Sequence, residues 1–428
     1  MTSIDPLTPA GRLAGDPFTV EGADLLIGGI PVKVLAERFG TPLYVYDAGT
    51  MRRSHDRLAA ALAGFAAIHY SIKANPNPAV IKVLIGQGAG VEIASLGEYR
   101  LARSAGAAPE NILFAGPGKR AAELEAVIAE GIGEIHLESL EEIARIERLA
   151  AGRSAPVPVA IRFNPVAEVQ GGAMRMGGRP APFGFDEEGL DGVIDRVQSS
   201  RTFDLRGVHM FAGTQILDAD ILAGQWAHGL AVAGRVARRI GRPLKTIDLG
   251  GGLGIPYFAG EAALDLARLA SHVPALVAAQ QADPLTRDAR VVVEPGRFLV
   301  GPAGLYVARV LAAKTSRGAR FLVTDGGMHH HLAASGNLGQ IIKRDYPVLA
   351  PARMGEAASV TAAIAGPLCT PLDMLARKAA LPDLGEGDLI AVLQSGAYGL
   401  TASPVGFLGH PAPAEVLVDG GEARLVSR

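Results

Sequence analysis

Short apolar segments alternate with amphipathic, alanine-rich segments from residue 48 to residue 300, and this alternation constrains the fold more than any other feature of the chain. The segments with strand-like composition are 67–72, 89–93, 111–114, 134–137, 157–163, 205–212, 245–249 and 290–294. Apolar residues recur at helical spacing between them, in segments such as 97–104, 121–130, 139–150 and 225–240. Ser139 and Glu142 also match the capping box that begins a helix. Strands that each precede a helix predict an α/β fold with a TIM-like (β/α)8 barrel, with an open doubly wound sheet as the alternative.

Beyond residue 304 the pattern changes to short, β-prone runs separated by Gly, Pro and Asp. These runs are 305–311, 320–323, 359–364, 388–393 and 415–418. Helical patterns become scarce, so we expect a mostly antiparallel β domain. The strand-like segment Leu43–Tyr46 precedes the barrel and is expected to join this domain. The predicted division is a barrel domain over 48–303 and a discontinuous β domain formed by 1–47 and 304–428.

The composition argues against several classes of protein. A net charge of −2 without a long basic run argues against nucleic-acid binding through a charged face. No stretch reaches the roughly 18 uncharged apolar residues that a membrane-spanning helix needs. The single cysteine, Cys369, cannot form an internal disulfide, which fits a cytoplasmic protein in a reducing compartment.

Polar and backbone-exposing residues follow nearly every predicted strand at its carboxyl end. They are Lys73, Glu92, Gly116 to Gly118, Glu138, Arg162, His209, Gly250 to Gly252, and Glu294 with Arg297. In a parallel barrel the catalytic residues lie at this end of the strands. The pattern therefore predicts one active site at the carboxyl face of the barrel.

Lys73 is expected at the last position of a buried strand, before a break at Asn75, Pro76 and Pro78. Desolvation lowers the pKa of an ammonium group, and a neutral amine can attack a carbonyl carbon. The position therefore suits a lysine that forms an imine. The alternative is a strand-end lysine whose charged head reaches water.

The run Gly250-Gly251-Gly252 follows the strand-like segment 245–249. Consecutive glycines let backbone N–H groups approach an anion, and we expect a helix N-terminus behind them to add a positive dipole. A phosphate monoester is favoured over a dinucleotide, because Ile255 occupies the last glycine position of the dinucleotide motif. A tight turn without a ligand is the alternative.

Glu294 and Arg297 are the first and last residues of a Glu-Pro-Gly-Arg motif at the end of the eighth predicted strand. The acid could pair with a ring nitrogen, and the arginine could hold a phosphate or carboxylate in bidentate fashion. A strand-end salt bridge between the two side chains is the alternative.

Three further motifs lie in the expected β domain. Two prolines flank Cys369, which suggests a fixed loop, although a buried and inert thiol is the alternative. His329, His330 and His331 are consecutive, so at most two of them could share a metal ion in extended backbone, and we predict no metal site. The segment Gln394–Tyr398 is typical of a strand that ends in a tight turn.

Taken together, these motifs resemble the fold-type III pyridoxal-phosphate decarboxylases, which include diaminopimelate, ornithine and arginine decarboxylases and share the alanine racemase-like fold. The motifs that carry the resemblance are Tyr70–Asn75, Phe114–Lys119, Gly213–Gln215, Gly250–Gly252, Glu294–Arg297, Gly366–Cys369 and Gly396–Tyr398. Two subgroups are the most similar: the butirosin-pathway enzyme that decarboxylates glutamate on an acyl carrier protein, and the decarboxylase of exosortase A systems. The segments Asp325–His331 and Phe407–Pro411 resemble hallmarks of those subgroups.

The resemblance implies roles for the matching residues. Lys73 would hold pyridoxal 5′-phosphate as an internal aldimine, Glu294 would pair with its pyridine nitrogen, and Cys369 would protonate the carbanion at the partner subunit's active site. The implied cofactor-binding set is Lys73, Glu92, Arg162, Phe211, Thr214, Gly250, Gly251, Gly252, Glu294, Arg297 and Tyr398. The implied substrate-binding set is Asp325, Asp373 and His329.

Three positions depart from the family pattern. Phe211 stands where the family places a histidine over the cofactor ring, and an aromatic ring can stack there but cannot titrate. The pattern of the diaminopimelate decarboxylases, which this chain resembles, has an acid at the position of Thr370 and an arginine near Ala333. Both residues are missing here. We therefore do not expect free diaminopimelate as the substrate.

The function expected from the resemblance is α-decarboxylation of an amino acid or of an aminoacyl group tethered to a carrier protein. An acid at Glu294 keeps the ring nitrogen protonated, which favours decarboxylation over the amino-acid racemase alternative. A catalytically dead binding homologue is a further alternative, although it would have no reason to keep Lys73, Glu294 and Cys369 together. The resemblance also implies a homodimer with shared active sites. An acyl carrier protein is a weaker expectation, for which the basic segment 169–179 is a candidate contact.

Overall fold

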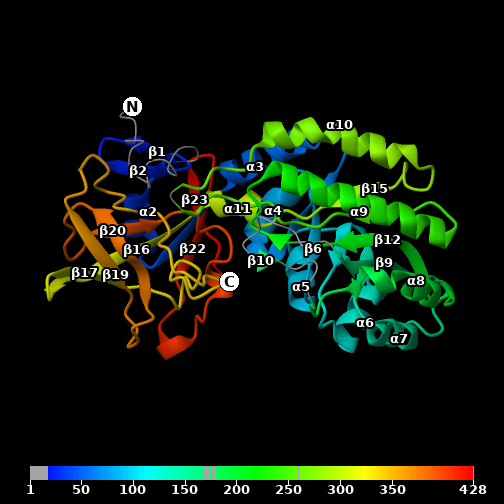
Figure 1. Cartoon of the computed structure of the whole chain (residues 1–428). Helices are drawn as coiled ribbons and strands as arrows, with labels where there is room; N and C mark the ends of the chain where they lie inside the picture. Colours follow the sequence, from blue (N-terminus) through cyan, green and yellow to red (C-terminus); the bar gives the residue numbers. More distant parts are fainter. Residues whose placement is uncertain (1–17, 167–173, 176–179, 212, 259, 428) are drawn as a thin grey trace. The chain divides into compact units, whose positions relative to one another are not determined.

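The computed structural model describes residues 18–166, 174–175, 180–211, 213–258 and 260–427. The chain forms two compact units, which are described separately below (Figure 1). The barrel unit comprises His55–Ile255 and Ala263–Phe298. The β unit comprises Met1–Ser54, Pro256–Ala262 and Leu299–Arg428.

The barrel unit contains a closed sheet of eight parallel strands. Around the barrel they are β5 (Ala67–Ser71), β6 (Gly90–Ile93), β7 (Ile112–Phe114), β8 (Glu134–Leu137), β9 (Val157–Asn164), β12 (Phe203–Met210), β14 (Thr246–Asp248) and β15 (Arg290–Val293). β8 pairs with β9, and β15 pairs with β5, so the first strand of the barrel lies beside the last. The predicted (β/α)8 barrel is confirmed, and the open doubly wound alternative is wrong because the sheet has no free edge among these eight strands.

One short strand extends this sheet: β11 (Phe185–Asp186) runs parallel to β9. β10 (Met174–Arg175) and β13 (Gly213–Thr214) form a separate two-stranded antiparallel sheet. Most of the basic segment 169–179, which we considered as a carrier-protein contact, lies outside the described residues.

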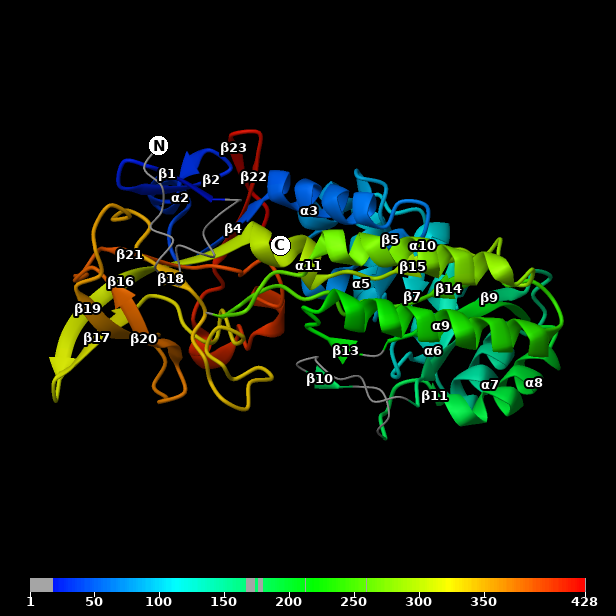
Figure 2. The ribbon, with the colours of Figure 1, turned by 45° about the horizontal axis from the view of Figure 1, so that its top comes forward.

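Helices surround the strands on the outside of the barrel (Figures 1 and 2). They are α4 (Pro78–Ile85), α5 (Leu96–Ser104), α6 (Ala121–Ala129), α7 (Leu140–Leu149), α8 (Leu190–Gln198), α9 (Ala219–Ile240) and α10 (Leu266–Ala282). Most consecutive helices pack side by side, as α9 and α10 do in Figure 2. The inner face of α9 carries Trp226, which is fully buried and lies 6.0 Å from Phe65 between ring centroids.

The strands lie within two residues of their predicted bounds, and the largest shift is in β12. This strand begins and ends two residues earlier than predicted and carries an irregularity between Leu205 and Gly207. A Cβ at Gly207 would lie 1.7 Å from the carbonyl oxygen of Thr246 on the neighbouring strand. Only glycine allows the two backbones to approach so closely.

The expected capping box at α7 is half correct. Ser139 Oγ accepts a hydrogen bond from the backbone N–H of Glu142 at 3.1 Å. The Glu142 side chain does not return to the N–H of Ser139, as a capping box requires, but accepts from the N–H of Glu138 at 2.8 Å and from Lys119 Nζ at 2.7 Å. The Glu142 carboxylate therefore binds the buried ammonium of Lys119 and the N–H of Glu138 in place of the N–H of Ser139.

The β unit is built on a long, mostly antiparallel sheet. Its strands are β4 (Leu43–Asp47), β16 (Gly304–Ser316), β17 (Ala319–Thr324), β18 (Val348–Leu349), β19 (Val360–Ala365), β20 (Met374–Leu381), β21 (Leu389–Val392), β22 (Ala414–Asp419) and β23 (Glu422–Leu425). The order along the main path is β20-β19-β17-β16-β4-β22-β23. β4 pairs antiparallel with β16 and parallel with β22, although these segments lie far apart in sequence.

Smaller elements complete the β unit and its junctions with the barrel segment. β1 (Phe18–Glu21), β2 (Asp24–Ile27) and β3 (Ile30–Pro31) form an antiparallel sheet, followed by α2 (Val32–Phe39). Their apolar side chains share one core with the main sheet, including Leu25, Ile27, Leu35, Val45, Leu305, Val307, Val416 and Val418. α3 (Ala48–Ala61) and α11 (Arg297–Val300) lie where the chain passes between the units. Across the described residues, every helix is too short or too polar to cross a lipid bilayer.

Candidate active site

Lys73 lies just beyond the carboxyl end of β5 and beside a buried carboxylate. The sequence predicted Lys73 at the last position of the strand. The strand instead ends at Ser71, and Lys73 belongs to a 3-10 turn over Ile72–Ala74. Its Nζ lies 3.1 Å from Glu92 Oε2 and 3.2 Å from Glu92 Oε1. The Lys73 side chain is 44% exposed, whereas that of Glu92 is 1% exposed. The expectation of a buried lysine is therefore wrong: the turn carries the amine out of the sheet, and Glu92 holds its charged end at the barrel mouth.

Glu92 is itself fixed by its neighbours on the same face of the barrel. Ser71 Oγ donates a hydrogen bond of 2.5 Å to Glu92 Oε2, and Ser71 pairs directly with Glu92 across β5 and β6. The carboxylate therefore receives two donors, one from a fixed hydroxyl and one from the lysine. This arrangement orients the amine of Lys73 without enclosing it.

A second group of charges surrounds Glu138, which follows β8. Arg162 Nη1 donates to Glu138 Oε1 at 2.8 Å, and Lys119 Nζ lies 4.0 Å from the same oxygen. Burial acts to raise the pKa of Glu138, but Arg162 and Lys119 lower it, and the result is a pKa below the usual value. Arg162 is thus held by a buried carboxylate at the carboxyl end of β9.

Sequence reasoning gave Lys119 no role, yet it is the most enclosed cation of this group. Its Nζ donates to the carbonyl oxygens of Gly116 and His136 and to Glu142, at 2.7 to 2.9 Å. Its side chain is fully buried. A lysine with three acceptors cannot attack a substrate, so Lys119 ties the loops after β7 and β8 together.

The glycine run packs closely against the segment that follows β12. Gly250 and Gly252 have φ angles of +67° and +102°, which favour glycine. A Cβ at Gly251 would lie 2.5 Å from the carbonyl oxygen of Glu294 and 3.7 Å from the Phe211 ring. The Gly252 carbonyl oxygen accepts a hydrogen bond from the N–H of Ile216, two residues beyond Thr214. The run thus brings its backbone, Phe211 and Glu294 together.

The prediction of a helix directly after the glycine run Gly250–Gly252 is wrong. Leu253 instead forms a parallel bridge with Ile216, and the next helix of the barrel unit, α10, begins at Leu266. Gly252, Gly254 and Pro256 disfavour helix in the intervening stretch. Any anion held here would therefore contact backbone N–H groups of the glycine turn without a helix dipole behind them.

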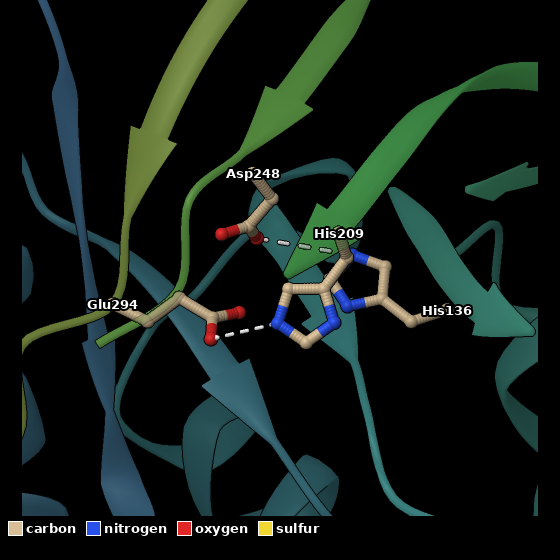
Figure 3. Close-up of side chains that lie close together, drawn as sticks. All are labelled: His136, His209, Asp248 and Glu294. Atoms are coloured by element: carbon tan, nitrogen blue, oxygen red, sulfur yellow. Dashed lines mark hydrogen bonds and ion pairs between the residues drawn. The ribbon is translucent and has the colours of Figure 1, made fainter. Parts of the chain in front are cut away.

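Glu294 belongs to a compact, buried cluster inside the barrel (Figure 3). His136, His209, Asp248 and Glu294 point toward one another from four different strands or strand ends, and each is at least 95% buried. One ligand-type atom from each lies within 4.8 Å of the others. His209 Nε2 lies 3.3 Å from Glu294 Oε2, and the His136 and His209 rings stack with centroids 4.2 Å apart.

The two acids of this cluster have different surroundings. Asp248 Oδ1 accepts a hydrogen bond of 2.8 Å from the N–H of Gly250, and Asp248 Oδ2 lies 3.8 Å from His136 Nε2. Burial raises the pKa of Asp248 well above its usual value, and the neighbouring Glu294 carboxylate raises it further. Burial likewise lowers the pKa of His209 well below its usual value. Both shifts favour the uncharged forms of Asp248 and His209.

Sequence reasoning did not select His136, inside β8, or Asp248, the last residue of β14. The available signal was alternation: Glu134 and His136 occupy alternate positions of β8, so they share one face of the strand, and Glu138 directly after it continues the spacing. Barrel interiors are usually filled with branched apolar side chains, so polar residues at that spacing mark a functional interior.

The remaining predicted site residues lie in the β unit. Cys369 is exposed in the loop between β19 and β20, so the buried, inert alternative for this thiol is wrong. Asp373 closes the same loop: its carboxylate accepts from the N–H groups of Met328 and Leu368 at 2.6 and 2.8 Å. Asp325 accepts from Thr41 Oγ1 and from the N–H of Arg309. Both acids therefore hold backbone segments in place.

His329 differs from its two neighbours in the histidine run. His330 Nε2 lies 3.0 Å from the Pro411 carbonyl oxygen, and His331 Nε2 lies 3.0 Å from Ser395 Oγ. His329 is fully buried, and neither of its ring nitrogens has a hydrogen-bond partner among the described residues. Its ring lies against His330 and His410. The three histidines form no group with other metal-ligating side chains in the described ranges.

Tyr398 and Arg297 are the last two residues of the predicted set. Tyr398 has a φ of +52° in the segment that follows β21, a conformation that a non-glycine residue rarely adopts. Arg297 begins α11, three residues after Glu294. The structure thus places Lys73, Glu92, Arg162, Phe211, Thr214, the glycines, Glu294 and Arg297 in the barrel unit, and Tyr398, Cys369, Asp325, Asp373 and His329 in the β unit.

Comparisons with known proteins give a consistent result. The model of the pyridoxal-dependent decarboxylase family, pyridoxal binding domain, matches residues 48–301. The chain is 41% identical over 401 residues to the L-glutamyl-[BtrI acyl-carrier protein] decarboxylase of Niallia circulans, covering 93% of both chains. It is 31% identical over 409 residues to the diaminopimelate decarboxylase of Aquifex aeolicus, covering 95% of this chain and 93% of that protein.

Solved structures agree with these sequence matches. The diaminopimelate decarboxylase of Helicobacter pylori in complex with L-lysine superposes with a TM-score of 0.82 at 26% identity. The alignment covers 92% of this chain and 95% of that chain. Both the barrel segment and the β segment of the sequence therefore have counterparts in this relative.

The raised pKa of Asp248 predicts a pH-dependent effect of Asp248→Asn. The native protein keeps a proton on Asp248 that the unfolded chain releases above about pH 4, so this residue lowers the free energy of unfolding as pH rises. Asparagine keeps the acceptor for Gly250 but does not titrate. We expect the free energy of unfolding of D248N, relative to wild type, to increase between about pH 4 and 7, by up to about 1.4 kcal/mol per pH unit. Urea unfolding of cofactor-free protein at several pH values measures this.

Asp191→Asn on the exposed face of α8 is the matched control. Its effect relative to wild type is expected to stay flat across the same pH range. A D248N difference that is equally flat would contradict a protonated Asp248.

Proposed function

The chain belongs to the pyridoxal-dependent decarboxylases, and we propose that it removes the α-carboxyl group of an amino acid or of an aminoacyl group on a carrier protein. The family model covers more than half of the chain, and relatives named as decarboxylases match over nearly its whole length. The family and the decarboxylase activity expected from the sequence are thereby confirmed, with pyridoxal 5′-phosphate as cofactor. The comparisons do not favour the racemase or the inactive homologue.

One observation carries the proposal: barrel closure brings Lys73 and Glu294 to the ends of two neighbouring strands. β15 pairs in parallel with β5, and the N–H of Ser71 donates to the carbonyl oxygen of Pro295 at 3.3 Å. A Cβ at Gly296 would lie 3.0 Å from both Ala74 Cβ and the Ser71 carbonyl oxygen. The segments that carry the amine and the acid therefore touch.

The described residues fit pyridoxal phosphate. Glu294 Oε1 is buried and no hydrogen bond to it is resolved in the described part of the chain, so it can accept one from a protonated ring nitrogen. The glycine run offers backbone N–H groups with no side chain in the way, and Thr214 lies in the segment packed against it. Lys73 supplies a primary amine that the barrel leaves 44% exposed.

Bound pyridoxal phosphate supplies an electron sink for the charge left when carbon dioxide departs. The chain supplies what surrounds that chemistry. Lys73 would hold the cofactor through its aldehyde, and Glu92 orients the amine of that lysine. Glu294 would pair with the protonated ring nitrogen, and Phe211 would offer an aromatic face to the ring. The glycines with Thr214, Arg297 and Tyr398 would hold the phosphate, and Arg162 would help position the site through Glu138.

In the β unit, we assign Cys369 as the proton donor, because its Sγ is exposed on a loop that Asp373 fixes. Asp325, Asp373 and His329 line the substrate side in this proposal. Of the three, His329 is the one with unused ring nitrogens among the described residues, which makes it the strongest candidate for a substrate contact. An exposed thiol also supports a cytoplasmic location, where reducing conditions keep it free.

A homodimer that shares its active sites is supported by exposed apolar side chains near Cys369. Ile341 is fully exposed, Ile342 is 80% exposed and Leu372 is 50% exposed. Asn337 Nδ2 donates to the Leu372 carbonyl oxygen at 3.2 Å, so the loop of the two isoleucines lies beside the cysteine loop. Apolar surface of this kind favours burial by another chain. We propose a second copy of this chain as that partner.

A carrier-tethered glutamyl group is the substrate we favour. A relative that is 41% identical is named for a glutamyl group on an acyl carrier protein. The residues that would suit free diaminopimelate are absent: Thr370 and the buried Ala333 stand in their places. Alanine at position 333 cannot supply the bidentate partner that an arginine would offer to a distal charged carboxylate.

Lys73→Ala is expected to remove the visible absorption band of the lysine-bound cofactor and to reduce turnover by at least about 1,000-fold, since covalent catalysis would be lost. Absorbance spectra after cofactor addition and carbon dioxide release measure the two effects. Lys82→Ala, on the exposed face of α4, is the control and should leave both unchanged. A K73A protein with an intact band would remove Lys73 from its assigned role.

Shared active sites predict that two inactive variants restore each other. Lys73→Ala and Cys369→Ala are each expected to lose turnover, but a mixture that exchanges subunits should regain part of it, because one site of each mixed dimer would contain both intact residues. Turnover of the mixture against each variant alone measures this. A mixture as inactive as its components, with subunit exchange demonstrated, would argue that each site belongs to one chain.

The substrate proposal predicts a preference for the tethered form. We expect kcat/KM for a glutamyl thioester of a carrier protein to exceed that for free glutamate by at least about tenfold, equivalent to about 1.4 kcal/mol of differential transition-state binding. Carbon dioxide release from both substrates gives the comparison. Equal values would exclude a role for the carrier, and stereochemical inversion without carbon dioxide release would favour the racemase.

A further inference from the structure

The two carboxylate oxygens of Glu294 have different environments. Oε2 lies 3.3 Å from His209 Nε2, whereas no hydrogen bond to Oε1 is resolved among the described residues. A hydrogen bond between the Asp248 and Glu294 side chains also contributes to the raised pKa of Asp248. The Glu294 residue is 5% exposed, so water does little to compensate Oε1. An unsatisfied buried carboxylate oxygen is unfavourable unless a ligand donates to it. One oxygen is thus used by His209, and the carboxylate keeps acceptor capacity for a ligand, since its two oxygens together can accept about four hydrogen bonds.

The tautomer of His209 follows from its surroundings. Burial lowers its pKa well below the usual value, and nearby His136 and Arg162 lower it further, so the ring is neutral. A neutral imidazole that faces a carboxylate through Nε2 must carry its hydrogen there, because two acceptors would repel each other. His209 Nε2 therefore donates to Glu294 Oε2.

The His209 ring is held in this orientation by His136 and Asp248. The two imidazoles stack at an interplanar angle of 24°. His136 Nε2 in turn lies 3.2 Å from Glu134 Oε1 and 3.8 Å from Asp248 Oδ2. Asp248 Oδ1 accepts from the Gly250 N–H, and the Gly250 carbonyl oxygen accepts from the Glu294 N–H, each at 2.8 Å. The backbone that carries Glu294 is thereby tied to the same cluster.

We propose that His209 is a positioning residue that holds Glu294 by one oxygen and presents the other to the cofactor's ring nitrogen, with His136 and Asp248 fixing the histidine. This inference rests on the proposed function. A donor on Oε2 withdraws electron density and lowers the proton affinity of the carboxylate. A proton shared between Oε1 and the ring nitrogen then stays on the nitrogen. The cluster thus sets the protonation of the ring as well as the direction of the acid.

His136, His209, Asp248 and Glu294 are residue types that could also bind a metal ion. The hydrogen bond between His209 and Glu294 distinguishes a metal site from a hydrogen-bonded cluster. A metal ligand must offer a lone pair, whereas His209 Nε2 carries a hydrogen in its contact with Glu294. A protonated Asp248 is likewise a poor ligand. Both observations favour a hydrogen-bonded cluster over a bound ion.

His209→Phe and His209→Gln test this role in the holoenzyme. Phenylalanine keeps an aromatic surface against His136 but has no donor, whereas glutamine keeps an N–H at the end of a similar reach. The readout is the nitrogen-15 resonance of ring-labelled pyridoxal phosphate bound to each protein, followed as a function of pH. For H209F we expect the shared proton to move toward the carboxylate, so that the ratio of protonated to unprotonated ring nitrogen falls about 10- to 100-fold at neutral pH, and for H209Q we expect most of this change to be reversed.

His228→Phe is the matched control, because His228 also pairs with a glutamate of the barrel unit, at 2.8 Å from Glu187. Its ring-nitrogen titration should equal that of wild type. A thermal melt of each variant separates loss of stability from loss of the nitrogen effect. An H209F protein with a lower melting temperature and a wild-type nitrogen titration would reduce His209 to a structural role and overturn the proposal.

A measurement on wild type alone keeps the test decisive if H209F does not fold. Nitrogen-15 labelling of histidine should show His209 as the Nε2–H tautomer, and an Nδ1–H tautomer would overturn the proposal. So would a stoichiometric metal ion in the purified holoenzyme that a chelator removes together with the His209 signal. If wild type binds no pyridoxal phosphate at all, the proposed function itself fails, which is a distinguishable result.

Discussion

Inside the barrel, His209 and Glu294 form a buried hydrogen bond, and many of the surrounding residues compensate the cost of burying these polar groups. Burying charged groups is unfavourable unless each is paired and hydrogen-bonded. The barrel meets this requirement at Asp248 by protonation and at Glu138 by two cations. Lys119 is satisfied by three oxygens. The interior is therefore a connected set of polar contacts rather than layers of hydrocarbon.

The glycine run couples the two ends of the proposed cofactor site. Gly250 donates to Asp248 and accepts from the backbone of Glu294, while the carbonyl oxygen of Gly252 accepts from the N–H of Ile216 in the segment after β12. A side chain at Gly251 would collide with the Glu294 backbone. The acid proposed to pair with the cofactor ring and the turn proposed to hold its phosphate are thus joined by hydrogen bonds, as preorganised electrostatic catalysis requires.

The β unit contributes a different kind of residue. Its proposed proton donor, Cys369, is exposed on a loop, but that loop is fixed at its base by the buried Asp373, which leaves no room for a side chain at Gly327 or Gly366. The barrel unit holds charges that must stay in place, and the β unit presents a thiol that must reach a substrate. Loops fixed on a rigid scaffold are the usual location for such groups.

The sequence by itself determined the alternation of strands and helices, the barrel and most of the chemistry at the strand ends, because side-chain periodicity is a local property. It also supplied Lys73 and Glu294 as candidates from their positions after apolar runs. It did not reveal that the glycine run lacks a helix behind it, or that Lys73 belongs to a turn, since both depend on contacts with Ile216 and Glu92 from other strands. Only the tertiary structure decided that the last strand closes against the first, and that His209 occupies one oxygen of Glu294 while the carboxylate keeps acceptor capacity for a ligand. Such assignments depend on the register of strands distant in the chain, which no local pattern encodes.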